Sequence, residues 1–138
     1  MSSACVRFEF DPSLSLLIFT ASGRLDHLQI IDCSNRAFAA HAAVSTIWDL
    51  TGADLSELSH HRLQEIIDAT KPINARRPMG AKTGLAASRE DVRALLGLFR
   101  ALNFNAPSHI DYRVFDSVRE ATDWIAGDSG NATIGSIA

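Results

Sequence analysis

The spacing of the hydrophobic residues switches repeatedly along this chain between the period of a strand and the period of a helix. Val6, Phe8 and Phe10 alternate with polar residues, which is typical of a strand with one buried face. The turn-forming sequence DPS separates this segment from a second apolar run at residues 14–23. Two such runs joined by a short turn predict an antiparallel hairpin.

Two helices are predicted in the next part of the chain. The first begins after Asp26, because aspartate is a favoured helix cap and apolar residues then recur at helical spacing. Its predicted buried stripe is Leu28, Ile31, Phe38, Ala39 and Ala42. The stripe of the second helix is Leu63, Ile66, Ile67 and Thr70. Pro72 should end or kink the second helix near Lys71, because the residue before a proline disfavours helical geometry.

Two further helices each follow a capping-box sequence. Ser88 with Asp91 would cap one of them, and Ser117 with Glu120 would cap the other. Their predicted buried faces are Val92, Leu95, Leu96, Phe99 and Leu102 in the third helix, and Val118, Ala121 and Ile125 in the fourth. Strands are predicted at residues 44–52, 81–88 and 109–115, and the last two should lie side by side. Strands that alternate with helices predict a sheet that is parallel except for its first strand.

Length, charge and composition exclude several classes of protein. The 138 residues suit one domain with a single core, which we expect at 1–126, with 127–138 as a flexible tail. A net charge of -3 gives no basic face for nucleic acid, and no apolar run is long enough for a membrane span. The first residues show no secretory signal, and Cys5 and Cys33 have no metal-binding or redox spacing. We therefore expect a cytoplasmic protein with free thiols, no metal and no other cofactor.

Four segments of the chain together resemble the SpoIIAA-like group of the STAS fold, which includes the anti-sigma factor antagonists. They are SGRL before the first helix, IWDLTGAD, GAKTGLAAS and the closing YRVFDSVREATDWI. The resemblance implies an α/β fold in which a mixed sheet of about five strands and four helices winds as a β-α superhelix. It also implies a non-catalytic regulatory module rather than an enzyme. Such a module would dock a protein partner through the loop and helix at 52–63, with the predicted contact residues Asp54, Glu57, Ser59, His60 and His61.

Ser59 is the candidate phosphorylation site that this resemblance implies. In the antagonists, a serine at the start of the helix after the third strand is phosphorylated, and Ser59 occupies that position. The chain departs from their Asp-Ser-Ser-Gly-Leu pattern, because Glu57, Leu58 and His60 replace the aspartate, the first serine and the glycine. The missing glycine weakens the expectation that a kinase recognises the segment. Serine is also a common helix cap, so a plain cap is the simpler interpretation and a phosphate switch is the alternative.

The other chemistry-bearing residues predict no catalytic or metal site. His60 and His61 are adjacent, so on a helix their side chains point about 100° apart and cannot easily share a metal ion. The sequence RRPMGAKTG has no glycine before its lysine and continues as a strand, so it is not a phosphate-binding loop. Arg76, Arg77 and Lys82 are nevertheless candidates for a local anion patch. No G-x-S-x-G elbow is present, and Asp32 beside Cys33 should raise the pKa of that thiol.

An alternative function is a carrier or sensor of a small apolar or anionic ligand. Related β-α folds include carriers with an apolar cavity, and the small residues of GLAAS would leave room for one. The candidate lining residues are Phe38, Trp48, Phe99 and Phe104. Core packing is the simpler role for Trp48 and for Trp124. A homodimer that pairs through the first strand is favoured over a monomer.

Overall fold

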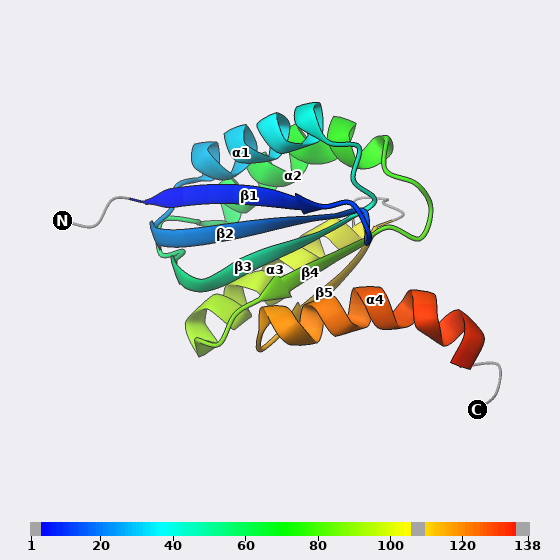
Figure 1. Cartoon of the computed structure of the whole chain (residues 1–138). Helices are drawn as coiled ribbons and strands as arrows, with labels where there is room; N and C mark the ends of the chain where they lie inside the picture. Colours follow the sequence, from blue (N-terminus) through cyan, green and yellow to red (C-terminus); the bar gives the residue numbers. More distant parts are fainter. Residues whose placement is uncertain (1–3, 106–109, 135–138) are drawn as a thin grey trace.

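The structure is a computed structural model that describes residues 4–105 and 110–134. Within these ranges it contains five strands and four helices in the predicted order (Figure 1). In chain order they are β1 (Cys5–Asp11), β2 (Leu16–Arg24), α1 (His27–Ala40), β3 (Ser45–Asp54), α2 (His60–Ala75), β4 (Lys82–Ala86), α3 (Glu90–Asn105), β5 (Asp111–Phe115) and α4 (Val118–Ile134). None of the described helices is long and apolar enough to cross a membrane.

The five strands form one mixed sheet in the order β1-β2-β3-β4-β5. β1 pairs antiparallel with β2, and every later pair is parallel, as predicted. The predicted contact between the fourth and fifth strands is confirmed, because Lys82 to Ala86 pair with Asp111 to Phe115. Figure 1 shows α1, α2 and α3 on one face of the sheet and α4 on the other. The strand order and the three helices on one face give the winding expected of a β-α superhelix.

α1 begins where the sequence predicts, but it buries a different face. The Asp26 carboxylate accepts a hydrogen bond from the Gln29 N–H at 2.9 Å, and the Gln29 side chain accepts from the Asp26 N–H at 3.0 Å. The predicted stripe is only partly right: Ile31 and Phe38 pack against the core, but Leu28 is 63% exposed, and Ala39 and Ala42 are exposed too. The buried residues are instead Ile30, Cys33, Ser34 and Ala37. Three of these four are small, and two of them, Cys33 and Ala37, pack against Leu17 and Phe19 of β2.

α2 continues past the residue at which it was predicted to end. Leu63, Ile66 and Ile67 are buried as expected, yet the helix extends through Pro72 to Ala75. Proline removes one N–H and so leaves the carbonyl group four residues earlier without its helical partner. That carbonyl belongs to Asp68, and both Asp68 and Pro72 lie on the exposed side of the helix, where water can bind the free oxygen. The predicted end of the helix near Lys71 is therefore wrong, whereas the alternative of a kink there stays a prediction.

The remaining boundaries differ from prediction by a few residues. β3 extends to Asp54, two residues past its predicted end, and α3 begins at Glu90, one residue later than a cap at Ser88 would give. The predicted cap of α4 is confirmed, because the Ser117 hydroxyl accepts from the Glu120 N–H at 3.2 Å. α4 is helical to Ile134, so the segment predicted as a tail is helical up to that residue. The domain limit at residue 126 and the flexibility of the tail remain predictions.

Candidate functional site

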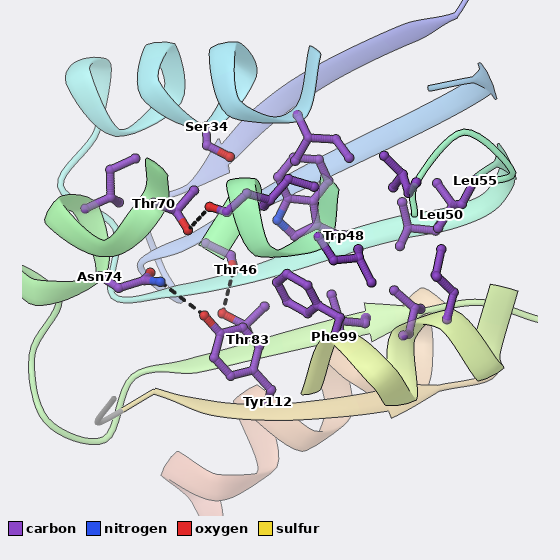
Figure 2. Close-up of a pocket in the computed structure, with 18 of the residues that line it drawn as sticks. Ser34, Thr46, Trp48, Leu50, Leu55, Thr70, Asn74, Thr83, Phe99 and Tyr112 are labelled. Carbon is purple, nitrogen blue, oxygen red and sulfur yellow. Dashed lines mark hydrogen bonds between the residues drawn. The ribbon is translucent and has the colours of Figure 1, made fainter. Parts of the chain in front are cut away.

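A cavity of about 90 Å³ lies between the sheet and the three helices α1, α2 and α3 (Figure 2). Side chains from β3, β4 and β5 form its floor, and side chains from the helices and from the loop between β3 and α2 form its walls. Three of the four residues predicted to line a cavity do so, namely Phe38, Trp48 and Phe99. The side chain of the fourth, Phe104, lies outside the described part of the structure. The cavity is the candidate functional site of this chain.

One end of the cavity is apolar. Leu50 in β3 and Leu55 in the loop that follows this strand lie at this end, as Figure 2 shows. Leu58 and Leu63 follow in the loop and in the first turn of α2, and both line the cavity. Trp48 lies towards the middle of the cavity, with its ring stacked on Phe19 at 4.1 Å between ring centroids. This stacking holds the indole against the sheet.

The other end of the cavity is polar and is built on a row of three hydroxyl groups. Thr46, Thr83 and Tyr112 are each the second residue of their strands, and parallel pairing places them side by side across β3, β4 and β5. The Thr46 and Thr83 hydroxyls are hydrogen-bonded at 3.0 Å. Because side chains alternate between the faces of a sheet, a shared register puts all three hydroxyl-bearing side chains on the cavity face.

The end of α2 covers this hydroxyl row. The Asn74 amide donates to the Tyr112 hydroxyl at 3.1 Å. The guanidinium of Arg77 donates to the Thr83 hydroxyl at 3.0 Å and to the Asn74 side-chain oxygen at 3.2 Å. It also donates to the backbone carbonyls of Val44, at 3.1 Å, and Lys82, at 2.9 Å. These bonds fix the end of α2 to the sheet.

Arg77 places a positive charge inside the protein beside the polar end. Its side chain lines the cavity, and the residue is only 6% exposed. Burial lowers the pKa of the Arg77 guanidinium to about 10, which still leaves it charged at neutral pH. Burial also raises the pKa of the Tyr112 phenol, so that group is neutral at the same pH. The polar end therefore combines a buried cation with neutral hydroxyls.

The predicted docking residues lie at the surface beside the apolar end. Arg24 lies 3.5 Å from the Asp54 carboxylate and 3.9 Å from that of Glu57, so the structure brings these two acids together around one cation. The backbone N–H of Ser56 is the main group that holds the pKa of Asp54 below its usual range. The Ser59 hydroxyl accepts from the Arg62 N–H at 3.2 Å, so Ser59 caps α2.

The two adjacent histidines lie at the start of α2. His60 and His61 are exposed, and His61 contacts Glu65 at 2.9 Å. Glu65 also contacts His27 from α1 at 2.7 Å, which links the starts of the two helices. Among the described residues, no group of three or more potential ligands could hold a metal ion.

The three residues predicted to form an anion patch are separated in the structure. Arg76 is exposed, whereas Arg77 is buried beside the cavity. Lys82 lies on the other face of the sheet, with its ammonium group 4.9 Å from the centre of the Trp124 ring. Cys33 is buried, and that burial is the main cause that raises its thiol pKa, in the predicted direction. Arg77 alone of the three predicted cations reaches the cavity.

Sequence reasoning missed the polar end of the cavity. Ser34, Asn74 and the row Thr46, Thr83 and Tyr112 were not singled out. A signal was present, since each member of the row is a hydroxyl residue at the second position of three successive strands. That signal becomes visible only when the strand boundaries and their register are known.

Comparison with protein-family models and with curated proteins gave no match. Among solved structures, the chain is similar to an uncharacterized protein of the DUF3478 family with a SpoIIAA-like fold from Shewanella loihica PV-4. The two chains are 19% identical with a TM-score of 0.59, and the match covers 91% of this chain and 98% of the other. This similarity and the observed architecture agree with the resemblance noted in the sequence. The chain therefore has a SpoIIAA-like fold, with a five-stranded mixed sheet and four helices.

Proposed function

We propose that this protein is a non-catalytic binding module that holds a small molecule in the cavity beneath α1, α2 and α3. The observation that carries the proposal is the division of one preformed cavity into an apolar end and a hydroxyl-lined end. Ligand sites are typically apolar clefts with a few converging polar groups, and this cavity has that composition. A carrier or a sensor of the ligand would both use such a site.

The size of the cavity limits the ligand. Its volume of about 90 Å³ is well below the roughly 300–1,000 Å³ of pockets that hold drug-sized molecules. The proposed ligand therefore has a short chain or a single ring as its apolar part.

The direct test is native mass spectrometry of the protein purified from its own cells. We expect a bound small molecule that is released when the protein is denatured. A ligand at one hundred times its dissociation constant should stabilise the fold by about 2.7 kcal/mol in a thermal melt. Protein that carries no small molecule, and that gains no stability from a library of small amphipathic compounds, would contradict the proposal.

Trp48 provides a spectroscopic test of where the ligand binds. The substitution Trp124→Phe leaves Trp48 as the single tryptophan, and Trp48 lines the cavity. A ligand in the cavity should change the intensity or wavelength of Trp48 emission. The matched variant Trp48→Phe keeps only Trp124, which packs against Phe115 in the hydrophobic cluster beneath α4. We expect little change there, and an equal response from both variants would place the ligand elsewhere.

A second candidate function is protein docking through the segment at 52–63. The observation that favours it is that this segment has two sides. Leu55 and Leu58 line the cavity, whereas Asp54, Glu57 and Ser59 lie towards the surface. A ligand that contacts Leu55 and Leu58 in the cavity would therefore change the positions of the neighbouring residues that a partner would contact.

Docking is tested by using wild type, Ser59→Ala and Ser59→Asp as baits in cell lysate. If Ser59 is a phosphate switch, Ser59→Asp should capture a different set of partners, because a new negative charge changes the complementarity of the surface. Thermal melts of the three baits control for folding. Identical partner sets from equally folded baits would leave Ser59 as a helix cap.

A further inference from the structure

The polar end of the cavity contains more hydrogen-bond donors than the described protein atoms can accept. Ser34 is the first of these groups. It is only 6% exposed, it lines the cavity, and its hydroxyl has no hydrogen-bond partner in the described part of the chain. Its oxygen is not sealed in the core, since no buried side-chain polar atom of the described residues is unsatisfied. The free hydroxyl therefore faces the cavity, as Figure 2 shows.

Trp48 provides a second donor. Its indole ring stacks on Phe19, but its N–H makes no hydrogen bond to any described residue. Indole nitrogen is only a donor, so this group needs an acceptor, which can be a water molecule or a ligand atom.

The hydroxyl row contributes two more protons. Thr46 and Thr83 share one hydrogen bond, and the Thr83 oxygen already accepts from Arg77. Two hydroxyl groups have two protons, and one bond between them uses one, so one proton remains whichever threonine is the donor. The Tyr112 oxygen accepts from Asn74, which leaves the phenolic proton without an acceptor among the described residues.

The charge around the cavity also favours a ligand that accepts hydrogen bonds. None of the described lining residues is an aspartate or a glutamate, and Arg77 contributes a buried positive charge beside Thr83. A buried positive charge near hydroxyl groups that still have protons to donate stabilises an anion with oxygen acceptors, and it disfavours a second cation. A carboxylate carries one negative charge and two acceptor oxygens, so it suits this set of groups.

We propose that the cavity binds a small amphipathic monocarboxylate, with its carboxylate at the hydroxyl row and its apolar part directed towards Leu50 and Leu55. The carboxylate oxygens accept from Tyr112 and from the threonine pair. Ser34 and the Trp48 N–H face the same space, and they reach the ligand directly or through a water molecule. This assignment rests on the proposed function and names the class of ligand for it.

The experiment compares three probes with the same apolar chain, namely hexanoate, hexan-1-ol and hexylammonium. Affinities are measured by Trp48 fluorescence in the Trp124→Phe variant and by calorimetry in the wild type. We expect hexanoate to bind about tenfold more tightly than hexan-1-ol, and hexylammonium to bind most weakly. Tyr112→Phe should weaken hexanoate binding by about tenfold because it removes one donor.

Thr70→Val is the matched control. Thr70 also lines the cavity, but its hydroxyl already donates to the Ile66 carbonyl at 2.8 Å, so it has no proton to offer. Hexanoate affinity in this variant should stay within about twofold of wild type. Thermal melts must show that both variants are folded, and Ser34→Ala can replace Tyr112→Phe if the latter is not.

The outcomes separate this assignment from the proposed function. If hexan-1-ol or hexylammonium binds as well as hexanoate, the carboxylate assignment is wrong and the binding cavity stands. Equal losses of hexanoate affinity in Tyr112→Phe and Thr70→Val would also overturn it. A hydroxyl with an unused proton would then contribute no more to binding than one whose proton is already donated. If none of the three probes binds, the assignment fails, and native mass spectrometry still decides whether the cavity holds a ligand of another class.

Discussion

The two faces of the sheet differ in how completely they are filled, and β4 shows the difference in two adjacent residues. Gly84 points towards α4, where a Cβ atom added to it would lie only 3.0 Å from the Ala121 Cβ. Leu85, the next residue, points to the other face and lines the cavity. One residue along the same strand thus separates a contact with no spare space from an open space of about 90 Å³.

The difference follows from the residues on each face. Ala121 is fully buried against the sheet, so α4 packs with its backbone close to β4. On the other face three helices share the sheet, and large side chains such as Trp48 and Phe99 line the space that remains between them. We infer that the α4 face mainly stabilises the fold and that the α1–α3 face carries the binding site.

The largest expected effect on stability tests the face of the sheet that packs against α4. Gly84→Val should destabilise the fold by about 2–3 kcal/mol, because its side chain must displace Ala121 and crowd Ile47 and Phe115. Urea denaturation measures the change. Gly97→Ala is the control, since an added Cβ at Gly97 has no neighbour within 4 Å and alanine favours the helix. A loss below about 0.5 kcal/mol for Gly84→Val would show that the α4 face can adjust, and the contrast would fail.

The second prediction uses the two thiols to measure how often the α1–α3 face opens. Cys33 is on the buried side of α1 and has a raised thiol pKa, whereas Cys5 is exposed. In Cys5→Ser the remaining thiol should react with a disulfide reagent at pH 8 at least about 100-fold more slowly than the thiol of Cys33→Ser. Saturating hexanoate should slow Cys33 further if the helices must separate for reaction. Similar rates for the two thiols would show that α1 is not held on the sheet.

The third prediction concerns the start of α2, which covers the face of the sheet that bears the cavity. Ser59→Ala should cost about 1 kcal/mol, because the Arg62 N–H loses its acceptor. Ser59→Asp should be nearly neutral, since aspartate also caps helices and its charge suits the helix dipole. Thermal melts compare the variants. If both substitutions cost the same, the cap contributes nothing specific to the stability of α2.

The sequence allowed the order of strands and helices to be predicted because local patterns indicate each element. The alternation in β1 and the caps at Asp26 and Ser117 are read from neighbouring residues, and the structure confirms them. The buried face of α1 was predicted only in part, because its apolar residues fit two overlapping stripes. Contact with β2 selects the stripe that contains Cys33 and Ala37, and the sequence of α1 alone does not contain that information.

The cavity was only partly predictable for the same reason. Large aromatic residues such as Trp48 and Phe99 are candidates for lining a cavity wherever they occur in a sequence, so they were identified from the sequence. The polar end depends on the register that places Thr46, Thr83 and Tyr112 side by side, although 66 positions separate the first from the last. Such a row is a property of strand pairing, and no local pattern marks its members.

The smallest expected effect on stability tests the cavity face of the sheet. It uses Leu85, the residue next to Gly84. Leu85→Phe adds a larger side chain, as Gly84→Val does, but into the cavity rather than against α4. Stability should therefore change by less than about 0.5 kcal/mol, because new contacts in an unfilled space offset any strain. Ligand affinity should nevertheless fall, since the phenyl ring occupies volume that the apolar part of a ligand needs. Urea denaturation and hexanoate titration of the same sample separate the two effects. A loss of stability similar to that of Gly84→Val would show that the cavity has no usable space, and the difference between the two faces would then be one of composition alone.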